Sequence, residues 1–183
     1  MKNKEIFNIA FSGILIAIGL VLPFLTGQIP EIGSMLLPMH LPVLICGFLC
    51  GWKYGLIVGF ITPILRSFTF GMPYFYPAAL AMGFELATYG FLCGLIFKFL
   101  NNKNINLIIS IYVSLIIAMI GGRVVWGVVR FIMGVIDSSN VFSFKMFIAG
   151  AFVTAWPGIV IQLTIVPLLL ISLSKTKVIE FYN

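Results

Sequence analysis

The 183-residue sequence is too apolar for a soluble domain, because 61% of its residues are hydrophobic and only 9% are charged, against averages of about 45–50% and about 25%. Its mean hydropathy is +1.17. The net charge of +6 is spread over short segments, which argues against nucleic-acid binding and instead indicates membrane topology. The composition therefore predicts an all-α integral membrane protein with a single domain over residues 1–183.

Apolar segments, separated by short polar ones, predict six transmembrane helices in chain order. The second segment begins with two prolines, Pro38 and Pro42, and ends at about residue 50, so it is short for a helix that crosses the whole membrane. A long loop over 26–37 precedes it, and another loop over 133–144 precedes the last helix. The six predicted spans are 6–25, 38–50, 56–70, 77–100, 105–131 and 146–173.

Lysines predict the orientation of these spans. With an even number of spans both chain ends lie on one side of the membrane, and that side collects most of the lysines. Because basic residues accumulate in cytoplasmic segments, we expect both termini to be cytoplasmic. The opposite side has little more than Lys145, whereas the predicted cytoplasmic side holds Lys2, Lys4, Lys53, Lys98, Lys103, Lys175 and Lys177.

Charged residues inside the apolar segments are the main functional signal. A charge in hydrocarbon is costly, so Arg66, Glu85 and Arg123 are expected to serve a purpose. Arg123, Trp126 and Arg130 share one helical stripe, and the glycines before Arg123 permit a close approach. An arginine can bind a carboxylate or phosphate at two points, and an indole offers a stacking face.

Two interpretations of these charges stay open. Glu85 either pairs with Arg66 or Arg123 to brace the helices, or contributes to a ligand site. One acid cannot neutralise all the arginines, so the surplus favours a ligand with an anionic or strongly hydrogen-bonding group. His40 could be structural or a ligand contact. Tyr74 and its aromatic neighbours suit either an interfacial belt or a lid over a cavity.

A stripe of small residues marks the first predicted span. Ala10, Gly13 and Ala17 lie on one helical face, and such faces allow two helix backbones to approach closely within lipid. The stripe could pack inside this protein or against a partner.

No enzyme motif is present. The sequence has no HExxH, GxSxG or nucleotide-binding lysine motif, so we expect no catalytic residue, no cofactor and no ATPase activity of its own. Cys46, Cys50 and Cys93 lie in apolar segments without clustered histidines, which favours small buried side chains over a metal site or a disulfide.

Several blocks, together with the six spans and the small-residue face, resemble the substrate-binding S components of energy-coupling factor (ECF) transporters. The resemblance covers nearly the whole chain. The blocks are LPMHLPV (37–43), CGFLCGWKYG (46–55), FELATYG (84–90), GRVVWG (122–127) and WPGIVIQ (156–162).

The resemblance implies a subunit, not an enzyme, that binds a water-soluble vitamin in the outer half of the membrane and docks through its first helix. Its partners would be a transmembrane coupling subunit and two ATPases. The aromatic and charged residues suit pyridoxine or hydroxymethylpyrimidine, and next pantothenate or niacin. The alternative is a self-sufficient secondary transporter of a small organic anion. The predicted binding residues are His40, Arg66, Tyr74, Glu85, Tyr89, Arg123, Trp126 and Trp156.

Overall fold

The computed structural model of the protein describes residues 2–26 and 29–175. Within these residues every regular element is helical, which confirms the predicted all-α class. The elements in chain order are α1 (Lys2–Val21), η1 (Leu22–Thr26), α2 (Pro30–Leu36), α3 (His40–Cys50), α4 (Trp52–Phe70), η2 (Phe75–Ala79), α5 (Leu80–Asn102), α6 (Leu107–Ile136), η3 (Ser138–Asn140), α7 (Phe144–Ile148), η4 (Ala149–Val153) and α8 (Trp156–Lys175).

Five segments of the described chain are long and apolar enough to cross a membrane. The helix α4 is not among them. It has 19 residues but includes Lys53, Pro63 and Arg66, which lower its apolar character. The sixth span therefore stays a prediction. The five segments are Lys4–Thr26, Glu31–Cys50, Phe75–Asn102, Leu107–Ile136 and Trp156–Ser174.

Several predicted boundaries are wrong. The last span was expected to be one helix over 146–173, but a separate short helix, α7, and the π-helical turn η4 precede α8. Pro157 stands in the first turn of α8, where its missing N–H has no helical hydrogen bond to lose. The predicted loop over 26–37 contains α2, and α6 extends to Ile136.

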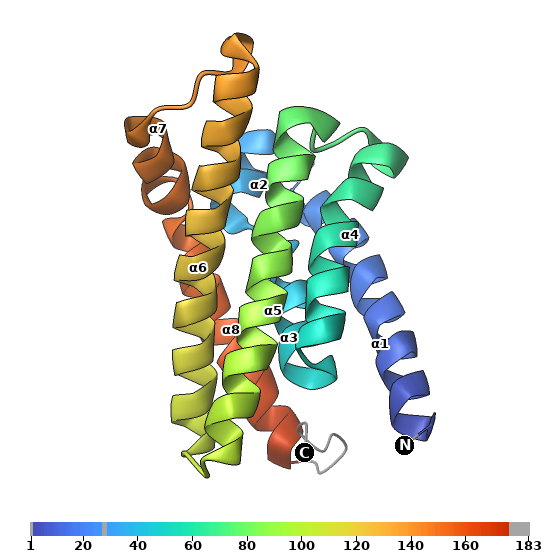
Figure 1. Ribbon diagram of the computed structural model, residues 1–183. Helices are drawn as coiled ribbons and strands as arrows, with labels where there is room; N and C mark the ends of the chain where they lie inside the picture. The colour runs from blue at the N-terminus through green and yellow to red at the C-terminus, as the bar shows by residue number, and fades with distance from the viewer. Residues whose placement is uncertain (1, 27–28, 176–183) are drawn as a thin grey trace.

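The bundle is organised around α5, which packs against α3, α4 and α6 (Figure 1). Glycines let α4 and α5 approach until their backbones touch. A Cβ atom on Gly90 would lie 2.2 Å from the carbonyl oxygen of Gly55, and one on Gly59 would lie 2.2 Å from that of Leu86. Small residues at such a crossing gain van der Waals contact that apolar side chains alone do not supply in lipid.

The two ends of the bundle differ. One end contains the start of α1, the end of α8, and the turns that join α3 to α4 and α5 to α6 (Figure 1). The other end contains α2 and α7. Lys53 and Lys103 belong to the first end and Lys145 to the second. The described lysines thus gather as the sequence predicts, while the direction of the bundle across a membrane remains a prediction.

Candidate functional site

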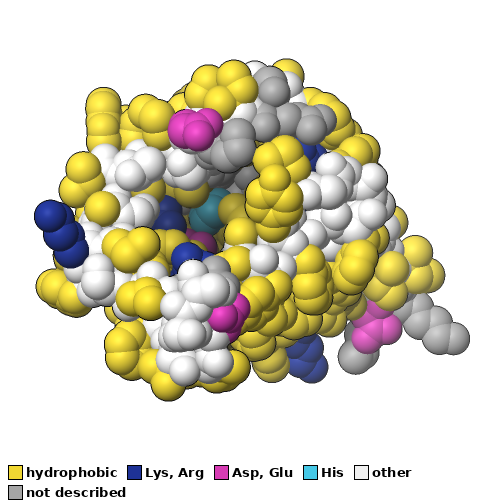
Figure 2. Space-filling model, turned by 90° about the horizontal axis from the view of Figure 1, so that it is seen from above, with side chains coloured by type: hydrophobic (Ala, Val, Ile, Leu, Met, Phe, Trp, Pro, Cys, Tyr) yellow, Lys and Arg dark blue, Asp and Glu magenta, His cyan; other side chains and the backbone are white. Residues whose placement is uncertain are grey.

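A cavity of about 680 Å³ opens at the end of the bundle that carries α2 and α7. Figure 2 shows this end as a hollowed face with basic, acidic and histidine side chains inside it. Its wall combines η1 and α2 with the upper parts of α4, α5 and α6 and with the turns η2 and η4. Charged side chains contribute to the wall from three helices, namely Arg66, Glu85, Arg123 and Arg130.

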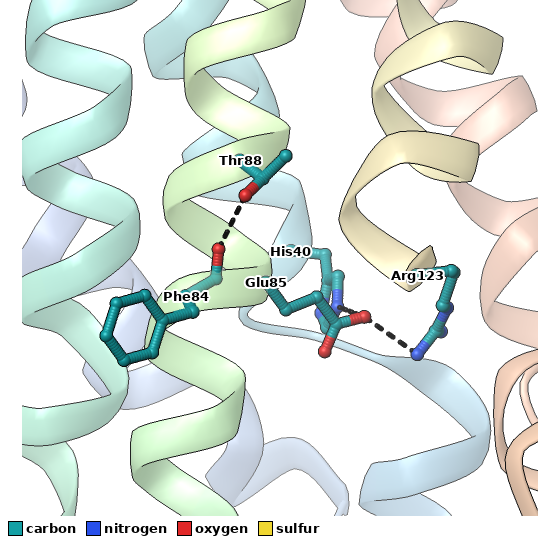
Figure 3. Close-up of polar contacts among 5 residues, drawn as sticks. All are labelled: His40, Phe84, Glu85, Thr88 and Arg123. Carbon is teal, nitrogen blue, oxygen red and sulfur yellow. Dashed lines mark hydrogen bonds and ion pairs between the residues drawn. The ribbon is translucent and has the colours of Figure 1, made fainter. Parts of the chain in front are cut away.

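Glu85 and Arg123 form a buried ion pair in this wall. Glu85 Oε1 lies 2.8 Å from Arg123 Nη1 and 3.5 Å from His40 Nε2 (Figure 3). The exposed fractions are 2% for Glu85, 5% for Arg123 and 0% for His40. Of the two partners that the sequence offered for Glu85, the structure therefore selects Arg123. Each charge offsets the other's cost of burial.

Close packing sets the position of this pair. The ring of Tyr89, one turn below Glu85 on α5, lies against Gly122 of α6, where a Cβ atom would be 2.6 Å from the ring. The close approach predicted at the two glycines before Arg123 is thus occupied by the Tyr89 ring at Gly122 and by the Leu92 side chain at Gly121. The Tyr89 ring also meets His40 edge to face at 5.1 Å. Tyr89 is fully buried and supports the site from behind.

Several buried polar atoms at the site have no hydrogen-bond partner among the described residues. These atoms include Nε and Nη2 of Arg123 and Nδ1 of His40, whereas Nε2 of His40 lies 3.5 Å from Glu85 Oε1. Buried donors without partners are rare in proteins, because each costs about 1–3 kcal/mol when water is excluded. The site therefore has hydrogen-bonding capacity that the protein itself does not use.

Arg66 lines the same cavity but has other partners. Its Nη1 donates to the carbonyl oxygen of Leu20, in the last turn of α1. Its guanidinium lies 4.9 Å from the ring centre of Phe24 and 5.3 Å from that of Phe70. A cation at the C-terminal end of a helix satisfies carbonyls that have no partner within the helix. Arg66 thus ties α4 to the end of α1.

Aromatic side chains surround Trp126 at the cavity wall. The Trp126 ring meets Phe142 edge to face at 5.3 Å and is stacked with Phe147 at 6.3 Å. Arg130, one turn beyond Trp126 on α6, lies 5.3 Å from the Phe142 ring centre. The segment after α6 is therefore attached to the cavity wall by ring contacts.

The structure brings together five of the eight predicted binding residues along the cavity: His40, Arg66, Glu85, Arg123 and Trp126. Tyr89 lies directly behind them. Tyr74 and Trp156 are 71% and 61% exposed, and neither lines the cavity. Arg130 also lines the cavity, although it is not among the predicted binding residues; its spacing from Arg123 and Trp126 on one stripe was the signal for it. Thr26 and Met39 line the cavity as well, and no signal in the sequence marks them.

The predicted docking stripe lies on the outside of the bundle. Ala10, Gly13 and Ala17 are exposed, and a Cβ atom on Gly13 would meet nothing within 4 Å. The inner face of α1 is formed by other residues, including Ser12 and Leu15. Within the described chain the stripe therefore has no packing role.

A multi-pass helical bundle with a charged cavity at one end is the architecture expected of a membrane protein that binds a small polar molecule. Residues 7–170 match the family model of the substrate-specific component of ECF transporters, so the chain belongs to this family. The family consists of transporter components, not enzymes, which work with a coupling subunit and ATPases. Searches of curated proteins and of solved structures give no match.

Proposed function

We propose that this chain is the high-affinity, membrane-embedded subunit that binds a water-soluble vitamin or vitamin precursor for an ECF-type importer. The observation that carries the proposal is the buried pair of Glu85 and Arg123 in the wall of a cavity of about 680 Å³. Cavities of about 300–1,000 Å³ suit small molecules, and a few fixed polar groups orient the ligand.

The importer would draw its energy from partners. An exposed stripe at Ala10, Gly13 and Ala17 supports docking of a transmembrane coupling subunit on α1, with two ATPases driving the cycle. Both termini would be cytoplasmic, which places the cavity towards the outside, where a scavenged nutrient arrives. The gathering of lysines at the opposite end of the bundle supports this orientation.

The sequence leaves the vitamin open, with pyridoxine or hydroxymethylpyrimidine first and pantothenate or niacin next. The first experiment is thermal unfolding of the purified protein in detergent against these four compounds and riboflavin. A ligand at about 100 times its dissociation constant adds about 2.7 kcal/mol of stability, so binding raises the unfolding midpoint.

A measurement of uptake by cells then distinguishes an ECF-type importer from a self-sufficient secondary transporter. We expect uptake of the stabilising compound only in cells that also produce an ECF coupling subunit and its ATPases. Uptake by this chain alone, driven by an ion gradient, would instead support a secondary transporter.

A further inference from the structure

The charges that line the cavity are unequal in number. Among the described lining residues, three are arginines, and Glu85 supplies a single carboxylate. That carboxylate pairs with Arg123, which leaves two guanidinium groups without an acidic partner. Positive charge in a site of low dielectric constant is costly unless an anion compensates it.

The two remaining arginines are not equivalent. Arg66 is held by the Leu20 carbonyl and by two phenylalanine rings, so it belongs to the wall. Arg130 contacts the Phe142 ring and has no acidic partner within the described part of the chain. It lies seven residues beyond Arg123 on α6, about 10 Å along the helix axis. One face of α6 therefore carries two arginines that border the cavity.

Only one of the three guanidinium nitrogens of Arg123 has a partner among the described residues. Glu85 approaches Nη1, whereas Nε and Nη2 are without a hydrogen-bond partner among the described residues. The N–H groups of Nε and Nη2 point in the same direction from one edge of the guanidinium plane. Two parallel donors on one edge match the two oxygens of a carboxylate.

We propose that the substrate is an organic anion whose carboxylate binds Arg123, with Glu85 holding the guanidinium from its other side. Arg130 supplies a second positive charge further along the cavity. This inference rests on the proposed function and narrows it, because it favours a carboxylate vitamin over a neutral ring such as pyridoxine. A neutral ligand would leave the positive charge of the cavity uncompensated.

Two pairs of compounds matched in shape test the charge directly: nicotinate with nicotinamide, and pantothenate with pantothenol. Pyridoxine serves as the neutral ring. Binding to the purified protein is measured by thermal unfolding and by calorimetry. We expect at least one acid to bind, and its neutral counterpart to bind about 10- to 100-fold more weakly, as for the loss of a hydrogen bond to a charged group.

Matched variants place the effect in the cavity. We expect Arg123→Gln to abolish the preference for the acid, whereas Lys145→Gln, which removes the same charge from an exposed residue that does not line the cavity, should keep it. If the Arg123→Gln protein does not fold, Arg130→Gln tests the same proposal. We expect this variant to bind the acid more weakly and the neutral compound with unchanged affinity.

The proposal is overturned if a neutral compound binds as tightly as its acid, or if neither acid binds. Import of pyridoxine through an ECF module would then leave the proposed function standing while the anion inference fails. An absence of both binding and import for all five compounds would count against both.

Discussion

At the scale of single residues, the Glu85–Arg123 pair is the feature on which the site depends. Both side chains are almost fully buried, and each would be costly alone in a membrane-embedded bundle. Their 2.8 Å separation also fixes α5 and α6 relative to each other at the cavity. The pair can therefore be tested as a brace separately from its role towards a ligand.

Glu85→Gln keeps the size of the side chain but leaves the Arg123 guanidinium without its counter-charge. We expect a loss of about 3–5 kcal/mol in the free energy of unfolding, measured by denaturant unfolding in detergent. The control is Thr88→Ala on the same helix. Thr88 donates a 2.8 Å hydrogen bond to the Phe84 carbonyl of its own helix (Figure 3), and its loss should change the free energy of unfolding by less than about 1 kcal/mol, because alanine is the better helix former.

Combining Glu85→Gln with Arg123→Met removes both charges and should recover most of the lost stability, while ligand binding is lost together with the Arg123 guanidinium. A Glu85→Gln protein as stable as the wild type would show that the pair does not brace the helices.

At the scale of elements, the crossing of α4 and α5 determines where Arg66 and Glu85 meet the cavity. It depends on glycines, since the backbones approach too closely for any Cβ atom at Gly55, Gly59 or Gly90. By contrast, Gly13 on the outer face of α1 has open space around it. The same substitution should therefore destabilise the protein at a glycine of the crossing but not at Gly13.

Gly90→Ala places a methyl group 2.2 Å from the Gly55 carbonyl oxygen, so the two helices must separate. We expect a loss of about 1–3 kcal/mol or more in the free energy of unfolding. Gly13→Ala should leave stability unchanged or raise it by up to about 1 kcal/mol, because alanine is the better helix former. Equal thermal midpoints for the two variants would contradict the close crossing.

At the scale of the whole molecule, the cavity and the small-residue stripe occupy different surfaces. The cavity lies at one end of the bundle, and the stripe runs along the outer face of α1. Binding and docking should therefore be separable by mutation.

Gly13→Leu and Ala17→Trp would place bulk on the stripe without entering the bundle. We expect both variants to abolish ATP-dependent uptake by cells that produce the complete transporter, while the affinity of the purified protein for its ligand is unchanged. The matched control is Ile132→Trp, which enlarges an exposed residue on α6 and should leave uptake intact. Parallel loss of binding and uptake in the α1 variants would mean that the stripe supports the fold instead.

The sequence was sufficient to predict those residues whose burial in a membrane costs much free energy. Charges in apolar segments are few and costly, so Glu85 and Arg123 stood out before their contact was known. The direction in which an aromatic residue faces was not predictable in the same way. Trp156 opens α8 beside the Pro157 break, so its orientation depends on where the helix begins. The contributions of η1 and α2 depend on contacts between distant segments.

The contact that Arg66 makes with α1 links the cavity to the helix that is proposed to dock a partner. The hydrogen bond from Arg66 to the Leu20 carbonyl joins the cavity wall to the last turn of α1, and Pro23 and Thr26 continue that wall directly after the helix. A partner that tilts α1 would therefore displace this part of the cavity wall. Thermodynamic coupling between two sites is reciprocal. A ligand that raises the affinity of a partner for α1 is therefore itself bound more tightly, by the same factor, when the partner is present.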